Sequence, residues 1–195
     1  MIKGAPRYAK LCFCAHMLPR TLRGASTLTR GLVFCAREDR ERNRANPATV
    51  STEDYRDEHI VRILHDTKTI AVVGASPKPN RYSHRVMEFM QRSGFRVIPV
   101  NPICAGDDIL GEQVYASLDE VPAPFEMVDV FRRMDAVPAV VDDVIRLAAD
   151  KGIHHLWLQV GLYDAELAGR ARGAGLNVVM DRCVKIEYGR LLAHG

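Results

Sequence analysis

This 195-residue chain lacks the features that mark membrane-spanning, disulfide-rich and zinc-binding proteins. None of its apolar runs approaches the roughly 18 residues that a membrane-spanning helix needs. Three of its five cysteines lie in the first 50 residues, and Cys104 and Cys183 have no cysteine or histidine partner at ligand spacing. We therefore expect no membrane association, no disulfide framework and no metal site, and a reducing compartment.

Acidic residues are nearly missing from the first 50 positions. These positions hold ten Lys and Arg but only three Asp and Glu, whereas positions 51–195 hold seventeen and twenty-one. An Arg-rich, acid-poor segment is typical of a mitochondrial transit peptide, and translation upstream of the natural start of a GC-rich gene would give the same composition. We predict a disordered or targeting-like basic extension over residues 1–50 and one folded domain over residues 52–195.

The charge of the folded part limits its partners. Its net charge is −4, against +3 for the whole chain, so it has no overall positive field that would attract nucleic acid. A small-molecule ligand is the expected partner, and a homodimer or a partner enzyme is left open. The expected location is the cytoplasm, or the mitochondrial matrix if the basic extension is a transit peptide.

Short runs rich in β-branched residues recur through the folded part. Strands that are buried on both faces of a parallel sheet have continuous apolar runs of this kind. The expected strands cover residues 69–74, 96–100, 127–131, 155–160 and 176–180, with a further short strand at 113–115.

Amphipathic segments fill the intervals between these runs. The alternation predicts an α/β fold, a Rossmann-like, doubly wound and mainly parallel sheet with helices on both faces. Ligands of such sheets bind at the carboxyl ends of the strands. The expected helices cover residues 51–66, 83–92, 136–150 and 164–173, the first capped by Ser51 or Thr52 and the second by Ser83.

The segment between the first long strand and its helix has the composition of a phosphate-binding loop. Gly74 permits a turn, and Ser76 and Ser83 can donate hydrogen bonds. The first N–H groups of the following helix carry partial positive charge. An ordinary solvated loop is the alternative, but the charges between residues 67 and 87 favour anion binding because none is acidic. The charged side chains are Lys68, Lys78, Arg81 and Arg85.

Two elements of a nicotinamide dinucleotide site are missing. The loop is not G-x-G-x-x-G, since Ser76 and Pro79 stand where glycines would be. The second strand ends in Val100-Asn101-Pro102, where an acidic residue would hold the ribose hydroxyls. A P-loop is excluded as well, because no G-K-[ST] occurs. These absences argue against an NAD(P)-dependent oxidoreductase, which stays an alternative.

Five short motifs follow one another at the ends of the expected strands. They are Ile70-Ala-Val-Val-Gly-Ala-Ser76, Val97-Ile-Pro-Val-Asn-Pro102, Val128-Asp-Val-Phe-Arg-Arg133, Leu156-Trp-Leu-Gln-Val-Gly161 and Met180-Asp-Arg-Cys-Val-Lys-Ile-Glu187. Together they resemble the small single-domain CoA-binding proteins, which are similar to the N-terminal CoA-binding domain of the succinyl-CoA synthetase α subunit. The resemblance extends from about Asp54 to Leu191.

The resemblance implies that the domain binds coenzyme A (or acyl-CoA). The glycine–serine loop would hold the phosphates, the end of the second strand would hold the adenine and ribose, and two later strand ends would border the pantetheine arm. The residues so implied are Gly74, Ala75, Ser76, Lys78, Arg81 and Ser83 for the phosphates, Pro99, Asn101 and Pro102 for the adenine and ribose, and Phe131, Arg132, Gln159 and Gly161 for pantetheine.

A complete catalytic site is not expected. No Ser-His-Asp or paired-carboxylate arrangement stands out. The ligase machinery of the synthetases lies in a further domain, so the resemblance implies binding without ligase activity; a CoA-binding subunit of an acyl-CoA ligase stays an alternative. Positive neighbours could favour a thiolate at Cys183 that exchanges with the CoA thiol, although a structural cysteine is the simpler interpretation.

Two adjacent arginines follow the third long strand. Arg132 and Arg133 could clamp a phosphate or a carboxylate. The alternative is an ion pair with Asp135 or Asp181.

Overall fold

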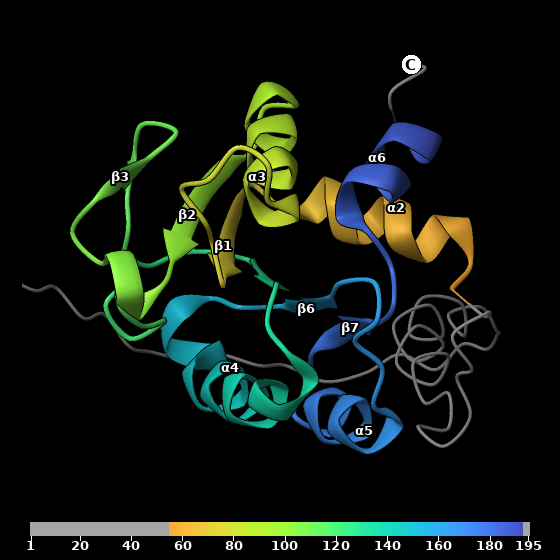
Figure 1. Cartoon of the computed structure of the whole chain (residues 1–195). Helices are drawn as coiled ribbons and strands as arrows, with labels where there is room; N and C mark the ends of the chain where they lie inside the picture. The colour runs from red at the N-terminus through yellow and green to blue at the C-terminus, as the bar shows by residue number, and fades with distance from the viewer. Residues whose placement is uncertain (1–54, 193–195) are drawn as a thin grey trace, which may run out of the picture. The chain divides into compact units, whose positions relative to one another are not determined.

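The computed structural model describes residues 55–192 (Figure 1). Residues 1–54 and 193–195 lie outside the described residues. The predicted basic extension and the predicted helix cap at Ser51 or Thr52 lie outside them too.

A five-stranded parallel sheet forms the centre of the described part (Figure 1). The strand order is β2-β1-β5-β6-β7. This order confirms the predicted doubly wound sheet, and its switch point, where ligands of such sheets bind, lies between β1 and β5. The strands are β1 Thr69–Val73, β2 Arg96–Val100, β5 Met127–Val130, β6 His155–Leu158 and β7 Asn177–Val179.

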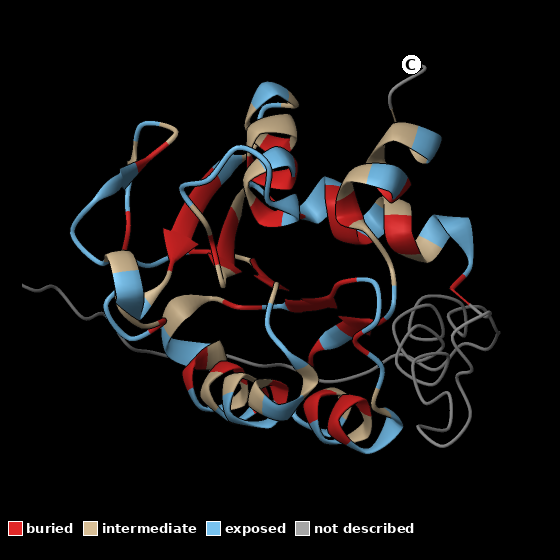
Figure 2. Cartoon of the chain, viewed as in Figure 1, coloured by how far each residue is buried: buried red, intermediate tan, exposed pale blue. Residues whose placement is uncertain are grey.

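Five α-helices in the described part cover both faces of the sheet, and Figure 2 shows their buried positions turned inward. One face packs against α4 and α5, and the other against α2, α3 and α6. Fully burying a large side chain such as that of Phe125 contributes about 1.5–3 kcal/mol. The helices are α2 Asp57–Asp66, α3 Tyr82–Arg92, α4 Val137–Lys151, α5 Ala165–Gly173 and α6 Val184–Leu191.

The helix predicted at 83–92 is confirmed, but its predicted Ser83 cap was wrong and one further helix was missed. Helix α3 begins at Tyr82 after Arg81, and Ser83 lies inside its first turn and makes no cap hydrogen bond. Helix α6 was not predicted at all, because Gly189 and the acidic Glu187 interrupt its apolar pattern. In the structure Glu187 is buried and ion-paired with Arg182 at 3.1 Å, so the polar position belongs to the packed face.

The predicted short strand at 113–115 is divided between two partners. Its start belongs to β4 (Glu112–Gln113), which pairs with β3 (Asp108–Ile109) in a small antiparallel hairpin. Its end makes one parallel bridge, from Tyr115 to Val100 of β2. This bridge holds the hairpin segment beside the carboxyl end of β2.

Candidate functional site

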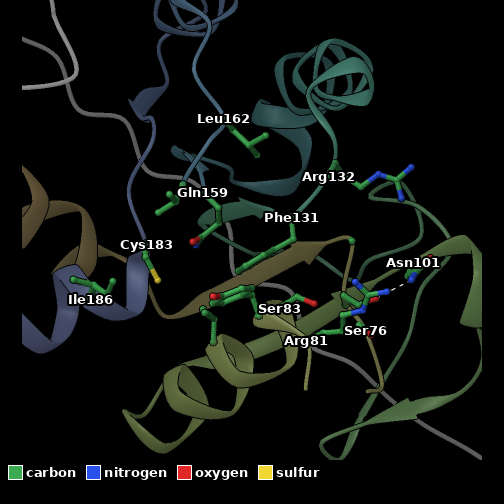
Figure 3. Close-up of a pocket in the computed structure, with 15 residues that line it drawn as sticks. Ser76, Arg81, Ser83, Asn101, Phe131, Arg132, Gln159, Leu162, Cys183 and Ile186 are labelled. Atoms are coloured by element: carbon green, nitrogen blue, oxygen red, sulfur yellow. Dashed lines mark hydrogen bonds between the residues drawn. The ribbon is translucent and has the colours of Figure 1, made fainter. Parts of the chain in front are cut away.

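A cavity of about 760 Å³ opens at the carboxyl edge of the sheet, beside the switch point (Figure 3). Its walls come from the loops after β1, β2, β5, β6 and β7 and from the first turns of α3 and α6. This volume falls in the range of about 300–1,000 Å³ that is usual for small-molecule sites. The site therefore lies where the doubly wound topology predicts a ligand.

Most of the residues predicted for the site line this cavity. Pro102 instead lines an adjoining cavity of about 230 Å³, which shares Gly74 and Arg132 with the larger one. Lys78 and Gly161 are exposed and Pro99 is buried in β2, and none of the three lines either cavity. The predicted residues that line the larger cavity are Gly74, Ala75, Ser76, Arg81, Ser83, Asn101, Phe131, Arg132 and Gln159.

Gly74 sets the path of the loop after β1. Its φ is +88°, and a Cβ on it would lie 2.1 Å from the carbonyl oxygen of Phe131. Its N–H donates to the carbonyl of Val100 at 2.9 Å. The loop thus leaves β1 between the ends of β2 and β5, through a space that only glycine fits.

The next residues present hydrogen-bond donors to the cavity. The Oγ atom of Ser76 accepts from the Lys78 N–H at 3.3 Å, which leaves its own hydrogen free to donate. The carbonyl of Ser76 lies 3.1 Å from Nδ1 of His84, which ties the loop to α3. Sequence reasoning did not identify this role of His84.

The amino end of α3 is open toward the cavity. No side chain caps the helix, and Arg81, Tyr82 and Ser83 at its start all line the cavity. Uncapped first-turn N–H groups carry partial positive charge and favour an anion.

Asn101 connects the loops after β1 and β2. Its Nδ2 donates to the carbonyl of Ala75 at 2.8 Å, and its Oδ1 accepts from the Ile103 N–H at 3.0 Å. Its backbone N–H donates to the Tyr115 carbonyl. The amide therefore braces the loop after β1, at the position where a dinucleotide site would carry a carboxylate.

The two neighbouring arginines differ in whether they form an ion pair. Arg133 forms an ion pair with Asp135 at 3.2 Å, as one of the two sequence interpretations expected. Arg132 is exposed, lines the cavity, and makes no ion pair or side-chain hydrogen bond with any residue between 55 and 192. Arg81 likewise has no acidic partner there. The described lining of the cavity contains these two cations and no Asp or Glu.

A buried polar pair lies at the ends of β5 and β6. Nε2 of Gln159 is 2.8 Å and 3.1 Å from the two carboxyl oxygens of Asp129. Burial raises the pKa of Asp129 to about 7, and the hydrogen bonds from Gln159 and the Val130 backbone oppose that rise. Gln159 lines the cavity, so the pair reaches the site through the amide. In the sequence, the aspartate inside the otherwise apolar run 127–131 is the signal that could have revealed this buried pair.

The remaining walls are apolar; Val160 lies within the predicted segment 159–161, and the other apolar residues were not predicted. Tyr82, Val160 and Ile186 line the cavity although they are strongly exposed large side chains. Val86 and Leu162 contribute buried apolar surface. An exposed apolar rim suits a ligand that has an apolar portion.

Cys183 also lines the cavity and is partly buried. It precedes the first residue of α6, and the Trp157 indole donates to the carbonyl of the neighbouring Arg182 at 2.7 Å. The loop that carries the thiol is thus held against β6.

No cluster of His, Cys, Asp or Glu within residues 55–192 could hold a metal ion. In the same part of the chain, no helix combines the length and hydropathy of a membrane span.

Comparison with known proteins identifies the family. The model of the CoA binding domain family matches residues 68–189. The chain belongs to this family. The uncharacterized protein YneT of Bacillus subtilis (strain 168) is 38% identical over 129 residues, which are 66% of this chain and 91% of YneT.

Solved structures agree with this membership of the CoA-binding domain family. A hypothetical protein from Pyrococcus horikoshii OT3 is 37% identical with a TM-score of 0.66, over 74% of this chain and 97% of that one. An acetyl-coenzyme A synthetase 1 from Ca. Korarchaeum cryptofilum is 25% identical with a TM-score of 0.50, over 57% of this chain but 25% of that one. The fold is thus found both as a small protein and as part of a larger synthetase.

Proposed function

We propose that this domain binds coenzyme A in the cavity at the carboxyl edge of the sheet. The loop from Gly74 to Ser83 and the open start of α3 bind the phosphates, with Arg81 as a cation. Asn101 lies on the adenine–ribose side. The pantetheine arm passes Phe131, Arg132 and Gln159 toward the apolar wall.

In addition to membership of the family, one structural observation supports the proposal. The cavity has two arginines without acidic partners in the described part of the chain and no carboxylate of its own. Because seven of the eleven other arginines between residues 55 and 192 are ion-paired, an anion is the group that would complete these two. Coenzyme A supplies a diphosphate and a 3′-phosphate together with a pantetheine arm that carries apolar groups as well as amides and a hydroxyl.

Thermal unfolding of the full chain tests the proposal. Coenzyme A should raise the melting temperature more than dephospho-CoA does, and NAD should raise it least. Equal responses to all three would indicate a general phosphate site. A response to NAD(H) or NADP(H) above that to CoA would instead favour the oxidoreductase alternative.

A matched pair of variants tests the phosphate end. Arg81→Ala should lose CoA-dependent stabilisation, whereas Arg92→Ala, in the same helix but paired with Glu88, should keep it. Equal behaviour of the two variants would contradict the assignment of Arg81.

The likeness to a larger synthetase supports a second form of the proposal, in which the domain serves a partner enzyme. A ligase subunit should co-purify with a larger ATP-using chain. A homodimer or lone monomer isolated from cells would argue for a CoA carrier or sensor.

A further inference from the structure

The orientation of one amide in the cavity wall is determined by a buried charge. Asp129 is 1% exposed and Gln159 is 6% exposed. Nε2 of Gln159 contacts both carboxyl oxygens of Asp129. An ionised carboxyl group only accepts hydrogen bonds, so above the Asp129 pKa of about 7 the NH₂ end of the amide must face it.

The other end of the amide is consequently available to a ligand. The side-chain oxygen Oε1 of Gln159 accepts no hydrogen bond from any described residue, and Gln159 lines the cavity beside Phe131 (Figure 3). A Gln without this neighbour could present either its side-chain carbonyl or its NH₂ group to the cavity. With Asp129 in place, the cavity presents an acceptor.

Structural stability does not account for Asp129. Its strand is already joined to β6 by backbone pairing, with Asp129 opposite Trp157. Burying a carboxylate costs free energy that an apolar residue in this apolar run would not cost. The raised pKa of Asp129 reflects that cost. The carboxyl group therefore requires a role outside the packing of the sheet.

We propose that Asp129 is a positioning residue that holds Gln159 as a hydrogen-bond acceptor for an N–H or O–H group of the bound ligand. This inference rests on the proposed function, under which the donor is an amide N–H or the hydroxyl of the pantetheine arm. The nucleotide half of coenzyme A would not use this acceptor. Discrimination between CoA and its nucleotide half thus depends on Asp129.

The test uses Asp129→Asn in the full chain, which removes the charge at nearly constant volume. Calorimetric titrations at pH 8, where Asp129 is ionised, compare coenzyme A with adenosine 3′,5′-bisphosphate, which lacks the arm. The variant should bind coenzyme A about tenfold more weakly, the usual effect of leaving one polar group unpaired. Its affinity for the bisphosphate should stay unchanged.

Thr67→Val is the matched control. Thr67 is also buried, and its hydroxyl donates to the Ile63 carbonyl at 2.7 Å, before the amino end of β1. This variant perturbs a buried hydrogen bond without touching the cavity. Both affinities should equal those of the wild type.

The outcomes separate the two claims. If the wild type fails to bind coenzyme A, the proposed function fails and the inference falls with it. If the wild type binds it and Asp129→Asn binds it equally well, or loses both ligands equally, the inference alone is overturned.

If Asp129→Asn does not fold, two other measurements decide. The side-chain NH₂ protons of Gln159 should be protected from solvent exchange in the free wild type, and Gln159→Met should lose affinity for coenzyme A but not for the bisphosphate. Unprotected protons or an unchanged Gln159→Met affinity would overturn the inference.

Discussion

The polar groups at the two edges of the sheet differ in how they are hydrogen-bonded and ion-paired. At the amino edge, one carboxylate oxygen of Glu126 accepts the N–H groups of Lys68 and Thr69 at 3.0 and 2.8 Å. The Glu126 carbonyl accepts the N–H groups of His154 and His155. These bonds join the starts of β1 and β6 to the residue that precedes β5, although Nε2 of His155 has no partner among the described residues.

At the carboxyl edge, two arginines that line the cavity are not ion-paired within residues 55–192. Arg81 and Arg132 have no ion pair in the described part of the chain, and the start of α3 has no cap. The same strands form both edges, so the sheet itself does not require this difference in how polar groups are paired. The carboxyl edge differs in placing two arginines without acidic partners in the described part around one cavity, where an anion would bind under the proposed function.

The largest expected effect is a loss of stability when the loop after β1, at the carboxyl edge, is disrupted. Gly74→Ala should lower the free energy of unfolding by more than about 4 kcal/mol, because its Cβ would overlap the Phe131 carbonyl and its φ is positive. Chemical denaturation measures this loss. Gly94→Ala is the control, since Gly94 also has a positive φ but open space around it; a loss of about 1–2 kcal/mol is expected. Equal losses would show that Gly74 is not sterically required.

The second effect concerns the buried carboxyl of the carboxyl edge. The pKa of Asp129 is raised from 3.8 to about 7, so between these pH values the folded state keeps a proton that the unfolded state has lost. Stability contributed by this group is therefore lost as pH rises through this window, by about 4 kcal/mol. Asp129→Asn should remove the dependence and be more stable than the wild type at pH 8. If the unfolding free energies of the two proteins change equally between pH 4 and 8, this prediction is refuted.

The amino edge should respond to pH in the opposite direction. Burial, aided by nearby His154, lowers the pKa of His155 to about 4, and its Nε2 has no hydrogen-bond partner in the described part. The unfolded state binds the proton first, so stability is lost as pH falls from 6.5 toward 4, by about 3 kcal/mol. As pH falls over that range, the unfolding free energy of the wild type should fall relative to that of His155→Gln. A difference that stays constant with pH would contradict burial of His155 as the cause.

A smaller effect separates the two neighbouring arginines. Arg132→Ala should weaken coenzyme A binding about tenfold, a loss typical of one charge-assisted hydrogen bond. Arg133→Ala should leave binding unchanged, because Arg133 already pairs with Asp135 and does not line the cavity. Titrations at one fixed salt concentration measure both. The reverse order of effects would assign the clamp to Arg133.

Local sequence patterns predicted most of the fold. The five strands were found because strands buried on both faces require continuous apolar runs, which few other elements have. Helix α6 was missed because its stability comes from packing and from the ion pairs of Glu187, neither of which appears as an apolar period. Propensity alone gives no account of such a helix.

The site was predicted where it follows a strand end or lies on the loop that leads from β1 to the start of α3. Gly74, Asn101 and Gln159 follow β1, β2 and β6, and topology brings these strand ends together. Ile186 and Val86 reach the cavity through the docking of α6 and α3, which depends on tertiary contacts. The pairing of Asp129 with Gln159 depends on strand register, which the sequence does not specify.

A crystal structure of the full chain with coenzyme A tests the central claim most directly. We expect the diphosphate within hydrogen-bond distance of the first-turn N–H groups of α3, close to Ser76 and Arg81, with the arm running past Gln159. Coenzyme A bound at another surface, or a cavity that stays empty at saturating coenzyme A, would contradict it.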